Sequence, residues 1–566
     1  MTNKQYAQQF QLLANLMELH GESSYRIKSY ANAYRIIRAI PEPVQEMSLA
    51  QVKEVKGIGD AIGHKIQELR LNGKIEMLDE YTAKTPIGVV HLMQIKGLGV
   101  KKIKLLWEEM DITSPGELLY ACNENRLITI KGFGAKTQAN IQKQLEYFFQ
   151  SRNKLHYATV ENEAENLVLD IQEVLGDTQV SLTGDVRRLM PEIEAIDLLV
   201  GQADMSAVFE ADLLELVSHD ADSAVYRCKT IDQGFAVILY TCPADFFGYN
   251  LLRTTGNEKF VQQFFELQFP NPIDWKHVNP AAFVGLDEAA IFELAKVPFI
   301  AAELRDIPKI IFKAQANPLP ALLEVADIKG VIHAHSTWSD GSQSIEQMAL
   351  HCQEKGYEYL GLTDHSKAAF YANGLSEERV LEQWKEIEIL NEKLAPFKIL
   401  KGIEADILYD GDLDYTPELL AGFDFVIASV HSNIRMNEEK ATQRLLAAIQ
   451  NPYTTILGHP TGRLLLSREG YPIDHKAVID ACAKHNVIIE LNANPLRLDI
   501  DYTWIPYALE QGVKIAVNPD AHSTKGVEDI HFGVLAARKG NLTAKDCINT
   551  LDLEQIEQLF AAKNKK

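Results

Sequence analysis

The sequence predicts a multidomain protein with an α-helical N-terminal region, an α+β middle region and a C-terminal barrel of alternating strands and helices. Three observations indicate this class. A Lys-Gly-apolar-Gly pattern occurs three times before residue 145, and strand-like and helical segments alternate from about residue 155 to 315. After residue 330, apolar strands repeatedly end in His, Asp or Glu. At 566 residues the chain is also too long for one domain.

Composition and charge narrow the class of protein. The apolar fraction of 46% and the charged fraction of 24% are typical of a globular protein. There is no run of 18 apolar residues, and the start, MTNKQYAQQFQLLANL, lacks the layout of a signal peptide. Six widely spaced cysteines without a CxxC pair indicate reduced thiols. We therefore expect a cytoplasmic protein, of a bacterial type of cytosol, that does not associate with membranes.

The net charge of −22 is distributed unevenly. Residues 1–155 hold 21 Lys and Arg against 16 Asp and Glu, whereas the remainder holds 35 against 62. A mildly basic N-terminal region in an otherwise acidic chain is compatible with local contact to phosphate groups.

The front region contains an internal repeat. VKGIGDAIGHKI (55–66), IKGLGVKKI (95–103) and IKGFGAKTQANI (130–141) share two glycines one residue apart, each followed by a helical stretch. Such a hairpin opens its backbone N–H groups at a helix N-terminus, which holds a phosphate without contacting a base. The pattern resembles the helix-hairpin-helix motif of DNA repair proteins. The expected DNA-backbone contacts are Lys56, Gly57, Gly59, Lys96, Gly97, Gly99, Lys131, Gly132 and Gly134.

The first copy lies in a longer stretch with a family resemblance. YRIKSYANAYRIIRAI followed by GIGDAIGHKIQEL resembles the small lyase domain of X-family DNA polymerases, in which a lysine forms a Schiff base with the sugar of an abasic site. Lys65 occupies that place in the motif. The alternative is that Lys65 is a surface phosphate contact.

The middle region resembles the palm and thumb of the same polymerases at three places: SLTGDVRRLMPEIEAIDLLVG, ILYTCPADFFGYNLLRTTGNEKF and FIAAELRDIPK. The residues that match are Gly184, Arg187, Arg188 and Asp197. Two-metal phosphoryl transfer needs converging carboxylates. The resemblance places Asp197 at the second of three aspartates, but Ala195 stands at the first and the third falls near Ile238.

Two nearby acids are weak substitutes for the missing carboxylates. On a strand, Glu194 points away from the face shared by Ala195 and Asp197, and Pro191 argues against a strand that reaches Glu192. An aspartate at 185 would repel a triphosphate. We therefore interpret the middle region as a scaffold that holds DNA and has lost nucleotidyl transfer.

The C-terminal region carries a series of potential metal ligands. Each apolar strand ends in a polar side chain, and helical stretches separate the strands, which is the pattern of a barrel with its active site at the carboxyl ends of the strands. His333 and His335, two apart on GVIHAH, would leave the same face of a strand. The full set is His333, His335, Asp340, His365, Glu404, His431, His459, Asp520 and His522.

This order of ligands resembles the PHP (polymerase and histidinol phosphatase) domain, a distorted seven-stranded barrel that holds three metal ions. The resemblance implies three groups: His333, His335, Glu404 and Asp520; Glu404, His431 and His459; and Asp340, His365 and His522. Mixed His and carboxylate ligands favour manganese, zinc or ferrous iron. Such ions would activate water and neutralise phosphate oxygens. Arg463, Arg497 and, with weaker support, Lys367 are candidate phosphate-binding cations, the alternative being surface cations.

Across nearly its full length, the chain therefore resembles bacterial X-family DNA polymerases with a C-terminal PHP domain. The expected domains are a lyase-like domain (1–80), a fingers-like domain (81–154), a nucleotidyltransferase-like palm (155–250), a thumb-like region (251–318) and the PHP barrel (326–566). We expect a DNA-repair phosphodiesterase, a 3′–5′ exonuclease with possible abasic-site endonuclease action, on gapped, 3′-ended or abasic DNA. The alternatives are an active gap-filling polymerase with exonuclease activity, a phosphatase of small phosphoesters, and a DNA-binding scaffold without catalysis. The oligomeric state is not predicted.

Overall fold

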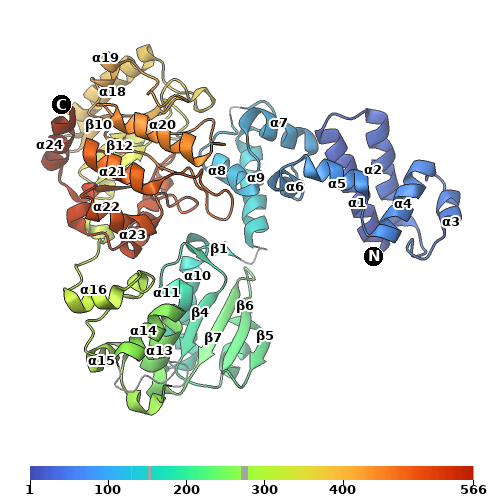
Figure 1. Ribbon diagram of the computed structural model, residues 1–566, viewed down its shortest axis with the longest axis horizontal. Helices are drawn as coiled ribbons and strands as arrows, with labels where there is room; N and C mark the ends of the chain where they lie inside the picture. The colour runs from blue at the N-terminus through green and yellow to red at the C-terminus, as the bar shows by residue number, and fades with distance from the viewer. Residues whose placement is uncertain (129, 151–153, 269–277, 565–566) are drawn as a thin grey trace. The chain divides into compact units, whose positions relative to one another are not determined.

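The computed structural model describes residues 1–128, 130–150, 154–268 and 278–564 (Figure 1). The chain divides into two compact units, residues 1–122 with 127–148, and residues 123–126 with 149–566. The bounds of the five domains expected from the sequence stay predictions. None of the helices in the described ranges is long and apolar enough to cross a membrane. All six cysteines are free and buried, in agreement with the expected reduced thiols.

The first unit is helical. Its helices are α1 (Asn3–Leu19), α2 (Ser24–Ala39), α3 (Leu49–Glu54), α4 (Asp60–Asn72), α5 (Glu76–Ala83), α6 (Ile87–Leu92), α7 (Val100–Met110), α8 (Pro115–Asn123) and α9 (Gly134–Gln150). The apolar face of α1, with Tyr6, Phe10 and Leu13 buried, packs against α2, α5 and α7.

The three glycine hairpins have the same local structure. In each copy the first glycine has a left-handed φ, +96° at Gly57, +87° at Gly97 and +98° at Gly132. The residue after it donates its N–H to a carbonyl three residues back, at 3.0 to 3.2 Å. Glycine adopts this φ without a side-chain penalty. The second glycine then begins a helix, since Gly59 and Gly99 cap α4 and α7 and Gly134 is the first residue of α9. The sequence prediction of three hairpins that lead into helices is confirmed.

The middle of the chain is a mixed α/β region. Its elements are β1 (Leu155–His156), α10 (Tyr157–Leu175), β2 (Val180–Leu182), α11 (Gly184–Arg187), β3 (Glu192–Ile193), β4 (Ile196–Val200), α12 (Ser206–Glu210), β5 (Leu214–Asp220), β6 (Val225–Thr230), β7 (Ala236–Thr241), α13 (Phe247–Thr255), α14 (Glu258–Gln268), α15 (Glu288–Leu294) and α16 (Ile310–Ala316).

Five of these strands form one sheet in the order β2-β4-β7-β6-β5, in which β4 and β7 are parallel and the other pairs are antiparallel. Helix α10 packs on one face through Val160, Leu167 and Ile171. Helix α13 covers the other face near Leu199 through Phe247 and Leu251.

One detail of the expected sheet is wrong. The sequence suggested that Ala195 and Asp197 share one continuous strand, but β4 begins at Ile196 and Ala195 lies in a bend. The short strand β3 does include Glu192, although Pro191 precedes it, and β3 pairs with β1 instead of joining the main sheet. The bend is needed because the chain leaves one sheet at Ile193 and enters another at Ile196.

The C-terminal region is a nearly closed barrel. Its elements are β8 (Gly330–Ala334), α17 (Ile345–Glu354), β9 (Tyr359–Leu362), α18 (Glu377–Leu394), β10 (Lys398–Asp406), α19 (Pro417–Leu420), β11 (Phe425–Ser429), α20 (Glu438–Gln450), β12 (Ile456–Leu457), α21 (His475–His485), β13 (Ile488–Asn492), α22 (Ile505–Glu510), β14 (Ile515–Asn518), α23 (Ile530–Lys539) and α24 (Leu553–Asn564).

All seven strands are parallel and follow chain order from β8 to β14. Residues after β14 close the gap to β8, because His335 N–H donates to the Ala521 carbonyl at 2.9 Å and Ala521 N–H donates to the His333 carbonyl at 3.2 Å. The predicted seven-stranded barrel is confirmed.

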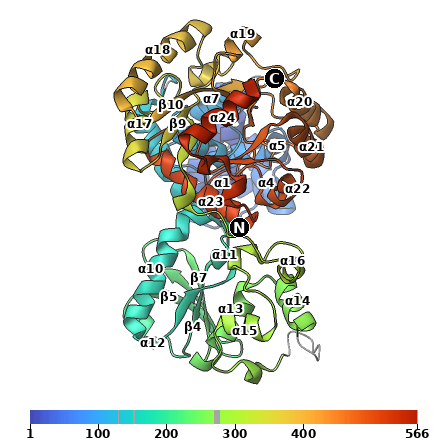
Figure 2. The same cartoon turned by 90° about the vertical axis from the view of Figure 1, so that its left-hand side faces the viewer.

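The barrel has an inner and an outer packing layer. Each strand contributes a residue to one buried cluster, which α24 covers through Phe560, stacked on Phe425 at 4.8 Å between ring centroids. Outside, α17 packs on β9 and α18 on β10 (Figure 2). This packing leaves the carboxyl ends of the strands for polar side chains.

Candidate metal centre

The nine expected ligands lie at or just beyond the carboxyl ends of six strands. His333 is in β8, and His335 and Asp340 follow it. Glu404 is near the end of β10, and the other five follow β9, β11, β12 and β14: His365, His431, His459, Asp520 and His522. Strand β8 is bulged at His333, whose φ is +74°. The simple alternation assumed for His333 and His335 is therefore wrong, but both imidazoles still reach one group of ligand atoms.

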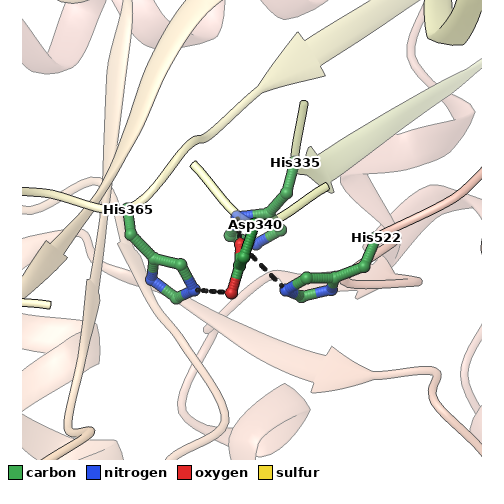
Figure 3. A group of neighbouring side chains, drawn as sticks. All are labelled: His335, Asp340, His365 and His522. Carbon is green, nitrogen blue, oxygen red and sulfur yellow. Dashed lines mark ion pairs between the residues drawn. The ribbon is translucent and has the colours of Figure 1, made fainter. Parts of the chain in front are cut away.

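Four side chains form one part of the centre (Figure 3). Asp340 lies between two imidazoles, with Oδ2 at 3.5 Å from His365 Nε2 and Oδ1 at 3.4 Å from His522 Nε2. His335 completes this group, and its ring lies 4.2 Å from the ring of His522. The ligand atoms of these four residues all lie within 4.8 Å of one another.

Glu404 joins the remaining ligands. Its Oε1 lies 3.3 Å from His333 Nε2, 3.1 Å from His431 Nε2 and 3.0 Å from His459 Nε2. Its Oε2 lies 2.9 Å from His365 Nδ1. Asp520 Oδ1 lies 3.1 Å from His335 Nε2 and 3.4 Å from His333 Nε2. The structure therefore brings all nine predicted ligands together.

The grouping differs in part from the one the resemblance implied. The compact groups are His335, Asp340, His365 and His522; His333, His335 and Asp520; and His365, Glu404 and His431. His335 and His365 each belong to two groups, because both nitrogens of these rings face acidic ligands.

The electrostatics of the site couple imidazoles to carboxylates. Burial alone would lower the pKa of His333, but the carboxylates of Glu490, Asp520 and Glu404 raise it well above its ordinary value. His335 is the opposite case, since burial and the neighbouring His522 and His365 lower its pKa to about 3. Despite burial, the surrounding imidazoles hold the pKa of Glu404 well below its ordinary value. These shifts favour the ionised form of Glu404 and the neutral form of His335, and a metal ligand must be in that form.

The donor atoms fit divalent metal ions. Among the described residues, His333 Nε2, His335 Nδ1, Asp340 Oδ2, Glu404 Oε2 and His522 Nε2 are buried without a hydrogen-bond partner of suitable geometry. Buried polar atoms are rarely left in that state unless something else satisfies them. A set of six imidazoles and three carboxylates suits zinc, manganese or iron better than calcium or magnesium.

Three acids that orient the ligands were missed from the sequence. Glu490 on β13 lies 2.6 Å from His333 Nδ1, and Asp406 on β10 lies 3.1 Å from His431 Nδ1. Asp364 accepts hydrogen bonds from Ser336, Ser339 and Gln383 and so fixes the loops around it. The sequence did contain a signal for these acids, since each lies beside a ligand or at the end of a strand. Asp406 is two residues after Glu404, and Asp364 directly precedes His365. Glu490 directly follows the apolar residues 487–489.

The candidate phosphate-binding cations have partners within the barrel. Arg463 donates from Nε to the Arg497 carbonyl at 3.0 Å and also contacts Asp501 and the Leu498 carbonyl. Arg497 itself is buried. Lys367 is 3.2 Å from Glu377. The Arg463 contacts favour a role in holding segment 497–501, so phosphate binding by these three residues stays a prediction.

Residues of the middle region that were assigned from the sequence to a palm-like domain also lie together. Gly184 has φ +58°, and a Cβ there would stand 2.2 Å from Asp197 Oδ2. Ile238 is the residue opposite Asp197 in the β4–β7 pair. Burial and the neighbouring Asp185 raise the pKa of Asp197 to about 7.

The two palm arginines are held by carboxylates. Arg187 forms two hydrogen bonds to Glu288, at 3.1 and 2.7 Å. Arg188 contacts Asp185 and lies 3.1 Å from Asp306. In the first unit, the candidate lyase residue Lys65 forms an ion pair with Glu68, with 2.6 Å between Nζ and Oε2. Its lyase role stays a prediction.

Comparison with family models agrees with this architecture. Residues 1–75 match a helix-hairpin-helix domain, residues 89–146 a SAM-like helix-hairpin-helix tandem, and residues 332–494 a PHP domain. The three glycine hairpins fall within the first two matches, and the predicted resemblance to helix-hairpin-helix and PHP domains is confirmed.

Comparison with curated proteins gives a match along the whole chain. The DNA polymerase/3′-5′ exonuclease PolX of Bacillus subtilis is 31% identical over 568 residues, which covers 98% of this chain and 99% of that protein. Further similarities cover less of the chain. A probable phosphatase of Thermoanaerobacter sp. is 29% identical over 245 residues, with 41% of this chain and 95% of that protein covered. The probable phosphatase YcdX of Escherichia coli is 31% identical over 168 residues, with 28% and 59% covered.

Proposed function

The chain belongs to the PolX family of DNA polymerase/3′-5′ exonucleases, and from that premise we propose that its PHP barrel removes nucleotides from DNA 3′ ends by metal-dependent phosphodiester hydrolysis. The convergence of nine buried ligands on one end of the barrel is the observation that supports this most directly. We propose cleavage at abasic sites as a second reaction of the same centre.

Three divalent ions, of manganese, zinc or iron, would activate water and neutralise phosphate charge at this centre when bound. The side chains of the protein determine how such ions are held. Glu490, Asp406 and the Asp520 carbonyl accept from the Nδ1 atoms of His333, His431 and His522, respectively. A carboxylate or carbonyl can only accept, so each Nδ1 carries the proton and Nε2 is left to bind a metal. Arg497 and Lys367 remain our candidates for contact with the phosphate.

DNA is the proposed substrate because the first unit carries three glycine hairpins within helix-hairpin-helix matches. The N-termini of α4, α7 and α9 follow these hairpins, and each has a lysine directly before its first glycine, Lys56, Lys96 and Lys131. These elements would hold the backbone of gapped, 3′-ended or abasic DNA without selecting a sequence.

Gap-filling polymerisation is the second activity to consider. The full-length similarity to a protein named for both activities favours it over the loss expected from the sequence. The local chemistry of the palm argues for loss, since Ala195 and Ile238 offer no carboxylate beside Asp197. Metal-dependent incorporation of dNTPs on gapped DNA, abolished in Asp197→Ala, would establish polymerisation and refute the loss.

Hydrolysis of small phosphoesters is a third candidate, because relatives that match 41% and 28% of this chain are named probable phosphatases. It predicts that the full chain hydrolyses p-nitrophenyl phosphate faster than a DNA 3′ end at equal concentration.

The proposed function is tested with 3′-recessed, gapped and abasic DNA together with metal analysis of the purified protein. We expect stepwise shortening from the 3′ end, lost on chelation and lost in His333→Ala. A matched control is His219→Ala, since His219 is exposed on the edge strand β5 and far from the ligand set in sequence. Unchanged cleavage by His333→Ala in nuclease-free preparations would show that the barrel is not the nuclease.

A further inference from the structure

An exposed phenylalanine stands beside the metal centre. Phe370 is 85% exposed, the largest value among the exposed large hydrophobic side chains in the described part of the chain. It lies in the loop 366–374, directly after the ligand His365. The ring of its neighbour Tyr371 lies 6.0 Å from the Phe370 ring and 6.4 Å from the His365 ring. Phe370 is therefore separated from a predicted metal ligand by one aromatic side chain.

The loop that carries Phe370 is firmly held. At its ends, Leu375 N–H donates to the His365 carbonyl at 2.9 Å and Ser366 N–H donates to the Glu404 carbonyl at 3.0 Å. Within it, Gly374 N–H donates to the Ala369 carbonyl at 3.0 Å, and a Cβ at Gly374 would stand 1.9 Å from the Ser366 carbonyl oxygen. Ala369 and Ala372 are buried, so the loop is anchored on both sides of Phe370 while the Phe370 ring faces solvent.

A solvent-facing aromatic ring on an anchored loop has a specific use next to a site for DNA ends. Exposure of a phenylalanine leaves apolar area in water that packing would otherwise remove. A nucleobase covers such a ring by stacking, and does so with little dependence on sequence because every base has a π-face. The terminal base of a strand is joined through one sugar to the phosphodiester that reacts, and Phe370 lies close to the ligands that would hold that phosphodiester.

We propose that Phe370 is a stacking platform for the terminal nucleobase of the DNA strand whose phosphodiester lies at the metal centre. This inference rests on the proposed 3′–5′ exonuclease function and adds a base-binding subsite to it. The subsite binds any base, and it distinguishes a strand that ends in an intact nucleotide from one that ends in an abasic residue.

The test compares two single-stranded oligonucleotides that differ only in the terminal nucleotide, which either carries a base or is a tetrahydrofuran abasic analogue. Wild type is expected to cleave the base-bearing substrate with the higher kcat/KM. In Phe370→Ala we expect kcat/KM for the base-bearing substrate to fall by about 5- to 150-fold. The abasic substrate should be nearly unaffected, because it has no base to stack. Phe370→Trp should retain the preference.

The control is Ile389→Ala, which removes another exposed apolar side chain, 66% exposed on α18 of the same barrel. It should leave both substrates unchanged. An equal loss on both substrates in Phe370→Ala, or an unchanged preference, would overturn the stacking role while the exonuclease remained established. Absence of His333-dependent cleavage in wild type would instead refute the exonuclease function, and the subsite with it.

Discussion

Replacing Glu490 with glutamine is expected to weaken metal binding while the barrel stays folded. Glu490 is fully buried on β13, and its two oxygens accept four hydrogen bonds. One oxygen faces His333 Nδ1 at 2.6 Å and Asn518 Nδ2 at 2.9 Å. The other faces the His459 N–H and Asn492 Nδ2, each at 3.2 Å. Glutamine has the same shape, but its amide nitrogen must point at one of these two pairs of donors.

The size of the effect follows from those contacts. Removal of a carboxylate that orients a metal-binding imidazole typically costs 10- to 100-fold in metal affinity. That range corresponds to about 1.4–2.8 kcal/mol of binding free energy. In the metal-free variant, the glutamine amide nitrogen would face two other hydrogen-bond donors. This costs about 1–3 kcal/mol of folding stability. Glu490 contacts two predicted ligand residues at once, so we expect the upper part of both ranges.

Metal affinity is measured by competition with a chromogenic chelator, and stability by urea unfolding in the presence of EDTA. The matched control is Glu392→Gln, which makes the same chemical change at an exposed position on α18. If Glu490→Gln bound metal as tightly as wild type, the orientation of His333 by Glu490 would be irrelevant to metal binding and the reasoning would be refuted.

Three further outcomes are expected. Burial and Asp185 raise the pKa of Asp197 to about 7. Between about pH 4 and about pH 7 this carboxyl group is therefore protonated in the folded state and ionised in the unfolded state, so the free energy of unfolding falls as the pH rises from about 4 to about 7. Asp197→Asn should therefore gain up to about 4 kcal/mol over wild type above pH 7 and nothing at pH 4, as measured by urea unfolding across this range. Lys539→Met removes a fully buried ammonium that lies 2.9 Å from Asp306, and should destabilise the protein by about 3 kcal/mol in the same assay; an unchanged midpoint would contradict the importance of this pair. Replacing the three hairpin lysines with glutamine should reduce the slope of log affinity for DNA against log salt by about two to three, and an unchanged slope would exclude phosphate contact by Lys56, Lys96 and Lys131.

The ligand set could be predicted from the sequence because most of the ligands follow an apolar run, and parallel strands gather their carboxyl ends at one edge. The grouping of ligands could not be predicted in the same way. Glu404 reaches four imidazoles because β10 has β8 and β9 on one side and β11 and β12 on the other, and each of these four strands carries or precedes one of the histidines. His365 also uses both of its ring nitrogens. The bulge at His333 also left no sequence signal, since a left-handed φ is uncommon for any residue other than glycine.

The palm shows where sequence reasoning was incomplete. Matching single residues identified Ala195 and Ile238 as substitutions, but it could not show what holds the two arginines. Their partners Glu288 and Asp306 lie about a hundred residues further along the chain, and no local pattern joins them. The same limit applies to Lys539, which contacts the Arg188 carbonyl at 2.8 Å across an even longer separation.

The acidic partners of Arg187 and Arg188 determine how easily these arginines could bind a nucleotide. Arg187 shares Glu288 with the fully buried Arg305, whose Nη1 is 2.6 Å from the same carboxylate. Arg188 shares Asp306 with Lys539 of α23, a helix of the barrel. A triphosphate that recruited either arginine would leave a buried charge without its partner, at a cost of about 3–5 kcal/mol unless the carboxylate found another cation. Arg305 already contacts Glu288, and Lys539 already contacts Asp306, so each carboxylate would keep one cationic partner. Polymerisation would therefore depend on Arg305 of the middle region and Lys539 of the barrel, which would retain Glu288 and Asp306 while the two arginines turned to the nucleotide.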